Sequence, residues 1–101
     1  MKCCVFAYGI LRDVKIRKEV LGYDTPSYPA AIEGFRTDSI KLGNTYYPIL
    51  VENERSNVPI GGEYFMIGDT DLSKLDDYES EAYRRKLVRI NNGMKAWVYL
   101  R

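Results

Sequence analysis

The chain opens with an almost unbroken run of hydrophobic residues, and regular polar positions come only further on. Residues 2–8 are nearly all apolar, a pattern typical of a buried strand. Gly9 ends this run. Asp13 is a suitable N-cap for a short helix through Leu21, and Gly22 follows as its stop. The start of the chain therefore predicts a buried strand followed by a short helix.

The middle of the chain is β-like but irregular, because glycine and proline separate short apolar runs. We expect strands at residues 29–35, 39–42, 49–52 and 63–67. Pro48 is expected to lie between two of these strands, where it would interrupt the β pattern.

The pattern then changes to a helix and a closing hairpin. Thr70 is a good N-cap, and residues 71–78 contain no glycine, proline or β-branched residue, which predicts a helix of about two turns. Residues 83–90 and 94–100 predict two strands, joined by an Asn-Asn-Gly turn.

No repeat, low-complexity tract or linker interrupts these elements, so we expect one domain over residues 1–101. A chain of this length buries enough surface for one core without metal or disulfide support. About five to seven short strands and one or two short flanking helices predict an α+β fold, whose mixed sheet curls into a small β-barrel.

Composition narrows the chemistry that this domain can perform. The chain has no histidine, which excludes Ser-His-Asp and Cys-His triads and any histidine-liganded zinc or haem. Its two cysteines, Cys3 and Cys4, cannot form a four-thiolate zinc site, so no metal site is expected. Any general base must be a carboxylate, a lysine, a tyrosine or a thiolate.

Charge and cysteine usage bear on partners and location. Fifteen basic against 14 acidic side chains argue against nucleic-acid binding, and we interpret the basic cluster at residues 84–89 as the solvated side of a strand. Cys3 and Cys4 are interpreted as free thiols in a reducing compartment, with a strained vicinal disulfide as the alternative. No stretch is long enough to cross a bilayer, and no cleavage site follows the first apolar run, so we expect a cytoplasmic protein with no membrane contact.

One carboxylate stands out in the second predicted helix. Leu72, Leu75 and Glu79 fall within an arc of about 60°, so the apolar stripe of this helix ends in a carboxylate. Burial and the unpaired carbonyl groups of a helix end both disfavour the anion, which is the environment of a raised-pKa general base. In the alternative interpretation the helix ends at Tyr78, and Glu79 begins a solvated loop.

A second candidate segment follows the first strand, at residues 8–11. The N–H groups of Gly9, Ile10 and Leu11 lose their strand partners at this point, and such a group of donors suits a carboxylate. An ordinary turn is the alternative.

Together, these segments resemble a known family. Residues 5–12, Val-Phe-Ala-Tyr-Gly-Ile-Leu-Arg, are similar to the Tyr-Gly-Ser/Thr-Leu loop of the γ-glutamyl cyclotransferase-like (AIG2-like) proteins. Residues 75–79, followed by Tyr83-Arg84-Arg85, resemble the Leu-Asp-x-Tyr/Phe-Glu and Tyr-x-Arg segments of that family. Similarity to the connecting strands extends the resemblance over nearly the whole chain.

The resemblance implies a cavity between the loop and the acidic helix, and an enzyme that acts on a small γ-glutamyl amine or γ-glutamyl amino acid without a cofactor. In that family the substrate's own α-amino group attacks the γ-carbonyl, which releases 5-oxoproline and a free amine. By this resemblance Glu79 is the general acid and base, the backbone of Tyr8–Leu11 binds the substrate's α-carboxylate, and Tyr83 shapes the pocket. Ile10 replaces the family's hydroxyl-bearing residue, which leaves the substrate open.

Two other functions remain alternatives at this point. A non-catalytic module could keep the same pocket and bind a small metabolite. A small β-barrel could instead bind RNA or a protein through Arg84, Arg85 and Lys86, although the near-zero net charge ranks this function last.

Overall fold

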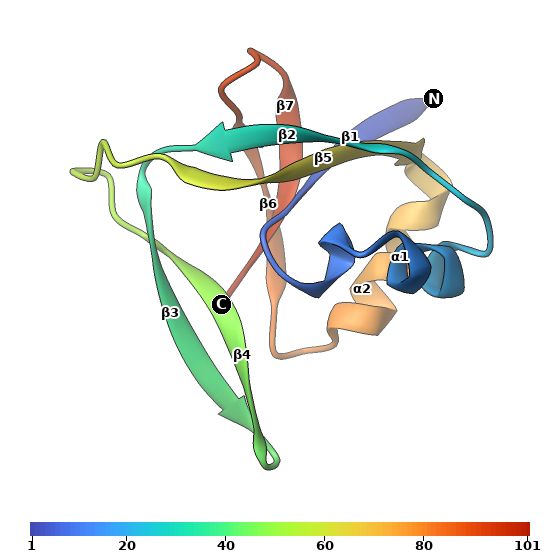
Figure 1. Ribbon diagram of the computed structural model, residues 1–101, viewed down its shortest axis with the longest axis horizontal. Helices are drawn as coiled ribbons and strands as arrows, with labels where there is room; N and C mark the ends of the chain where they lie inside the picture. The colour runs from blue at the N-terminus through green and yellow to red at the C-terminus, as the bar shows by residue number, and fades with distance from the viewer.

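The computed structural model describes all 101 residues as seven strands and two α-helices with two short 3-10 helices (Figure 1). The strands are β1 (Lys2–Ala7), β2 (Ser27–Ile32), β3 (Phe35–Leu42), β4 (Thr45–Glu52), β5 (Ile60–Gly68), β6 (Arg84–Arg89) and β7 (Lys95–Leu100). The helices are η1 (Ile10–Arg12), α1 (Val14–Leu21), η2 (Asp69–Asp71) and α2 (Leu72–Glu79). The predicted α+β class is confirmed.

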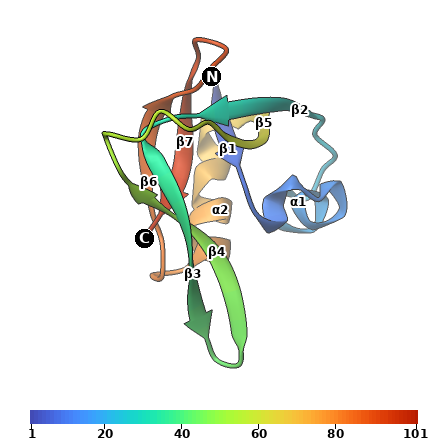
Figure 2. The same cartoon turned by 60° about the vertical axis from the view of Figure 1, so that its left-hand side comes forward.

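The strands form two sheets. Five of them make a mixed sheet in the order β2-β5-β1-β7-β6, in which β1 runs parallel to β7 and antiparallel to β5. β3 and β4 pair only with each other, as an antiparallel ribbon that extends away from the sheet in both views (Figures 1 and 2). The strands therefore curl around a common core without closing into one barrel, because β2 and β6 keep free edges. Gly34, with φ +87°, makes the turn that takes the chain from one sheet to the other.

The core lies on both faces of the five-stranded sheet. Along β1 the side chains alternate: Cys4 and Phe6 pack on the face toward the ribbon, and Val5 and Ala7 pack on the opposite face, toward the helices. All four are buried, which confirms the predicted first strand. α1 and α2 lie next to each other in both views and cover the second face (Figures 1 and 2).

Both ends of α1 lie where the sequence predicts them, whereas the start of α2 does not. Asp13 caps α1 by accepting a 2.8 Å hydrogen bond from the Lys15 N–H, and Gly22, with φ +88°, ends the helix. Thr70 was expected to cap the second helix, but it lies inside η2, and the residue before α2 is Asp71. The prediction was wrong because a 3-10 turn precedes the helix and takes Thr70 into helical backbone.

The ribbon strands are longer than their hydrophobic pattern predicts. Pro48 lies inside β4, opposite Ser39, and does not separate two strands. Proline lacks an N–H donor, and an edge strand tolerates it because one side of the strand has no partner. Each strand of a two-stranded ribbon has such a free side, so the expected break at Pro48 was wrong.

Neither α-helix is long and apolar enough to cross a membrane. Cys3 and Cys4 are both free thiols. The basic side chains of β6 are largely paired with acids: Arg84 and Lys86 with Glu52, and Arg85 with Asp76.

Candidate active site

A cavity of about 340 Å³ opens between the loop after β1, the C-terminal end of α2 and the tip of the β3–β4 ribbon. Both candidate segments and Tyr83 line it, so the fold brings every predicted site residue to one place. Its fifteen lining residues are Val5, Phe6, Ala7, Tyr8, Gly9, Ile10, Leu11, Leu42, Tyr47, Pro48, Tyr78, Glu79, Ser80, Tyr83 and Tyr99.

Glu79 lies on the last turn of α2, inside this cavity. Leu72 and Leu75, on the same stripe of the helix, are buried against the sheet and hold this face inward. Burial raises the pKa of the Glu79 carboxyl to about 7. The carboxyl has no hydrogen bond or ion pair with any protein group, so a ligand can occupy its oxygens. The helix includes Glu79, contrary to the alternative in which it ends at Tyr78.

Strained backbone follows Glu79 directly. Ser80 has φ +65° and ψ −174°, a conformation that residues other than glycine rarely adopt. Its N–H donates a 2.9 Å hydrogen bond to the Asp76 carbonyl and closes the helix. The chain thus turns sharply away after Glu79 and leaves this carboxyl at the end of the helix.

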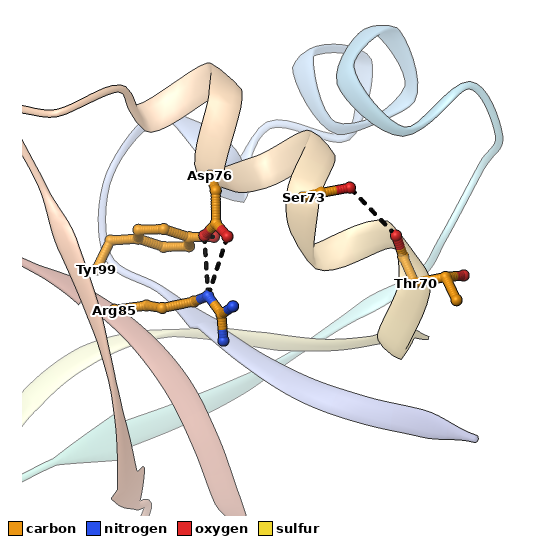
Figure 3. A network of polar contacts seen from close by, with 5 residues as sticks. All are labelled: Thr70, Ser73, Asp76, Arg85 and Tyr99. Carbon is orange, nitrogen blue, oxygen red and sulfur yellow. Dashed lines mark hydrogen bonds and ion pairs between the residues drawn. The ribbon is translucent and has the colours of Figure 1, made fainter.

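A polar network fixes the end of α2 against the hairpin formed by β6 and β7 (Figure 3). The Asp76 carboxylate accepts a bond from Arg85 Nε at 2.9 Å and one from the Tyr99 hydroxyl at 2.7 Å. The Arg85 guanidinium also lies 4.5 Å from the ring centroid of Trp97. Because Asp76 is one turn before Ser80, this network sets where Glu79 lies. Sequence reasoning missed these partners, although Asp76 was part of the recognised motif.

Tyr8 joins three strands at the base of the cavity. Its hydroxyl donates to the Tyr99 carbonyl at 2.7 Å and accepts from the Leu50 N–H at 3.2 Å. Burial raises the pKa of this phenol above its ordinary value, so it stays protonated. Because both bonds are internal, Tyr8 contributes its ring and its backbone to the site, and the hydroxyl holds the loop in place.

The loop after β1 presents unpaired amide donors. The N–H groups of Gly9, Ile10 and Leu11 donate to no backbone or side-chain acceptor, whereas the Gly9 carbonyl accepts from the Arg12 N–H at 3.1 Å. Three free N–H groups in consecutive residues suit an anionic oxygen. Because this loop and Glu79 line the same cavity, the arrangement suits a carboxylate bound in that cavity.

Arg17 supports this loop from behind. Its side chain is only 1% exposed, and its guanidinium donates to the carbonyls of Leu11 at 3.0 Å, Arg12 at 2.8 Å and Thr25 at 2.9 Å. No carboxylate pairs with it. The buried guanidinium holds these carbonyl groups in place. It therefore stabilises the loop conformation in which the amide groups have no protein acceptor. The sequence signal for Arg17 was its position on the apolar face of α1, between hydrophobic residues.

Tyr83 and Ile10 complete the walls. The Tyr83 hydroxyl lies 3.4 Å from the Pro48 carbonyl, which links the start of β6 to the ribbon. Ile10 is 51% exposed and still lines the cavity, so it forms part of the rim. No group of three or more acidic or cysteine side chains is placed to hold a metal ion.

Comparison with solved structures supports the fold. An Arabidopsis thaliana protein with a solution structure is 23% identical, with a TM-score of 0.80, over 99% of this chain and 62% of its own. A second Arabidopsis thaliana protein is 28% identical, with a TM-score of 0.77, over 98% of this chain and 68% of its own. A structure described as a gamma-glutamyl cyclotransferase is 16% identical, with a TM-score of 0.80, over 99% of this chain and 66% of its own.

This chain is therefore shorter than these neighbours and spans less than two thirds of the first. A search of curated proteins gave no match. The model of one family, described as gamma-glutamyl cyclotransferase, AIG2-like, matches residues 5–101. Since this match covers nearly all of the sequence, the chain belongs to the gamma-glutamyl cyclotransferase, AIG2-like family.

Proposed function

We propose that this protein is a γ-glutamyl cyclotransferase, which converts a γ-glutamyl amine or γ-glutamyl amino acid into 5-oxoproline and a free amine. The observation that carries the proposal is the Glu79 carboxyl, which is unpaired, faces a cavity and has a pKa raised by burial to about 7. A general base works best when its pKa is near the working pH, and an ordinary glutamate, near 4.3, is too weak a base for an ammonium group.

The chemical step is an intramolecular transfer. Glu79 takes a proton from the substrate's α-ammonium group, and the freed amine attacks the γ-carbonyl carbon. A carbon–nitrogen bond forms within the new ring, and the bond from the same carbon to the leaving nitrogen breaks. The protons lost by the attacking nitrogen pass through Glu79 to the leaving amine, so the carboxylate is restored. The substrate supplies the nucleophile, so the protein has only to orient it and move protons.

The other residues take positioning roles in this proposal. The free N–H groups of Gly9, Ile10 and Leu11 hold the α-carboxylate of the substrate, which orients its α-amino group toward Glu79. Tyr8 keeps this loop in place, and Tyr83 forms a wall. We place the reaction in the cytoplasm, since both cysteines are free thiols.

The test is release of 5-oxoproline from a panel of γ-glutamyl amines and γ-glutamyl amino acids. We expect Glu79→Gln to lower kcat/KM by about 10²–10⁴-fold, because the variant cannot accept a proton. Asp77→Asn is the matched control, since Asp77 is an exposed carboxylate on the same helix. Circular dichroism checks that both variants fold.

Equal activity of wild type and Glu79→Gln would contradict the role of Glu79. A wild-type protein that turns over nothing in the panel, but gains thermal stability from 5-oxoproline, would instead favour the non-catalytic binding module.

A further inference from the structure

The mouth of the cavity is unusually apolar for a surface feature. Several of the large hydrophobic side chains that the fold leaves exposed gather there, from the η1 loop, the ribbon tip and α2. They are Ile10 (51% exposed), Leu42 (38%), Tyr47 (37%) and Tyr78 (41%). Exposed apolar side chains that cluster around one opening mark a binding surface.

The same cavity has no positive charge. Glu79 is the sole charged side chain among its lining residues. Arg84 and Arg85 line an adjoining hollow that shares Ser80, Tyr83 and Tyr99 with the cavity, and each has an acidic partner: Glu52 lies 3.5 Å from Arg84, and Asp76 lies 2.9 Å from Arg85. A second anion in the cavity would therefore lie near Glu79 with no cation among the lining residues to balance it.

From these observations we infer the class of leaving amine, an inference that rests on the proposed function. When the amides of the η1 loop hold the α-carboxylate and Glu79 faces the reacting nitrogen, the leaving group extends toward the apolar rim. We propose that the preferred substrates are γ-glutamyl amides of uncharged, apolar or aromatic amines, and that γ-glutamyl amino acids are disfavoured. Ile10, Leu42 and Tyr47 are the residues that determine this preference.

The physical reason is a difference in desolvation. An apolar amine buries hydrocarbon surface against the rim and gains free energy from leaving water. A leaving group with a carboxylate must lose part of its hydration without gaining a counter-ion from the lining residues, and it is also repelled by the Glu79 carboxylate. An ammonium group at the far end of the leaving amine would also lose hydration against the same apolar walls, a cost that attraction to the Glu79 carboxylate offsets only in part.

Substrate pairs that differ in one charged group test this proposal. γ-Glutamyl-phenethylamine and γ-glutamyl-phenylalanine differ only by the carboxylate of the leaving group, and γ-glutamyl-butylamine and γ-glutamyl-putrescine differ by a terminal ammonium. We expect kcat/KM to be at least about tenfold higher for the uncharged member of each pair. Equal or reversed preference in either pair would overturn the proposal.

A second experiment places a positive charge on the rim of the cavity. Leu42→Lys puts a cation at the ribbon tip, where the wild-type side chain is partly exposed, and should bring the phenethylamine to phenylalanine ratio close to one. Leu42→Met keeps an apolar rim and should keep the wild-type ratio. If Leu42→Lys leaves the ratio unchanged, Leu42 does not determine the preference. If the wild type prefers phenylalanine and Arg84→Gln removes that preference, the adjoining hollow binds the leaving group.

Binding to Glu79→Gln separates the specificity from the catalysis. Calorimetry with this variant measures the affinity of the same pairs without requiring turnover, and because the variant lacks the Glu79 charge, it isolates the contribution of the apolar rim. Tighter binding of the uncharged members supports the specificity even if the wild type shows no turnover, in which case only the proposed function fails. Equal or reversed affinities overturn the specificity even if 5-oxoproline is released.

Discussion

Glu79 is central to the proposed chemistry, and its buried carboxylate also lowers the free energy of unfolding. Burial raises the pKa of this carboxyl to about 7, whereas in the unfolded chain its pKa is near 4.3. Between these values the folded state binds more protons than the unfolded state, so stability falls as pH rises through this range. Above about pH 7 the full cost of the buried anion is present.

We therefore expect Glu79→Gln to be more stable than the wild type at pH 8, by about 1–2 kcal/mol after allowance for solvent screening of a partly exposed group. The two proteins should approach equal stability as the pH falls below about 4.3, where the carboxyl becomes protonated in the unfolded state as well as in the folded state. Urea unfolding from pH 4 to 8 measures this difference. Glu81→Gln is the control, because Glu81 is exposed. A difference that does not change with pH would show that the carboxyl is not buried.

Glu79 owes its position to residues that do not touch the proposed substrate. The Asp76 carboxylate is held by Arg85 and Tyr99, and the Asp76 carbonyl accepts the N–H of Ser80 in the strained turn. Strained conformations persist only where the surrounding structure determines them. The network in Figure 3 is thus the reason that a short helix can present an unpaired carboxyl at its end.

At the scale of the elements, β5 packs closely against β1 at Gly62. Gly62 of β5 has no room for a side chain, because an added Cβ would lie 2.6 Å from Cζ of Phe6 and would also meet the Ala7 carbonyl oxygen. Ala7 is the last residue of β1, directly before the loop that presents the free amides. A glycine in β5 therefore allows β1 to reach the cavity in its observed position.

Gly62→Ala should destabilise the protein by about 1–3 kcal/mol, because the carbonyl is backbone and the ring is buried in the core. In a domain of this size that lowers Tm by about 4–8 °C for each kcal/mol. Gly61→Ala is the neighbouring control: nothing lies within 4 Å of its added Cβ, so we expect no loss of stability. Thermal unfolding compares the two variants, and equal Tm values would contradict the close packing.

Local sequence signals correctly predicted the helix ends and turns that depend only on the residues at those positions. Asp13 and Gly22 bound α1 as expected, and the Asn-Asn-Gly turn joins β6 to β7. Helical periodicity put Glu79 on the apolar stripe but left a helix end at Tyr78 as the alternative, and the structure decides between them because α2 includes Glu79. Thr70 and Pro48 misled because their roles depend on what precedes or pairs with them: a 3-10 turn in one case and a free strand edge in the other.

Long-range contacts in the site had no local signal. The Tyr8 hydroxyl is hydrogen-bonded to Leu50 and Tyr99, which lie 42 and 91 positions further along the chain. The buried guanidinium of Arg17 donates hydrogen bonds to carbonyl groups of the loop. Neither partner set follows from hydrophobic period or residue type. The sequence thus predicted which segments line the cavity, whereas the hydrogen bonds that hold these segments together depend on the tertiary structure.

At the scale of the whole molecule, the cavity lies between a firmly held part and a weakly held part. Its floor and one wall come from β1, β7 and α2, which belong to the packed sheet and helices. Another wall comes from the tip of the β3–β4 ribbon, whose strands pair only with each other. An isolated two-stranded ribbon is marginally stable, and here only Phe35, Ile49 and Leu50 are buried within its strands.

Hydrogen exchange should therefore divide the molecule into two parts. We expect amides of the central strands β5, β1 and β7 to exchange most slowly, and amides near the ribbon tip, at residues 40–47, to exchange at least about tenfold faster. Mass spectrometry of peptides from the native protein measures both. Uniform protection would contradict a separate opening of the ribbon.

Because Leu42 and Tyr47 at this tip line the cavity, a ligand in the cavity should change the exchange pattern only in the segments around it. Saturating 5-oxoproline is expected to slow exchange at the tip and in the loop at residues 9–12, because a ligand that binds only the closed arrangement stabilises it. Residues 27–32 of β2, on the far edge of the sheet, serve as the internal control. Added protection in β2 alone would place the ligand elsewhere, whereas added protection at the tip would make ribbon closure part of substrate binding.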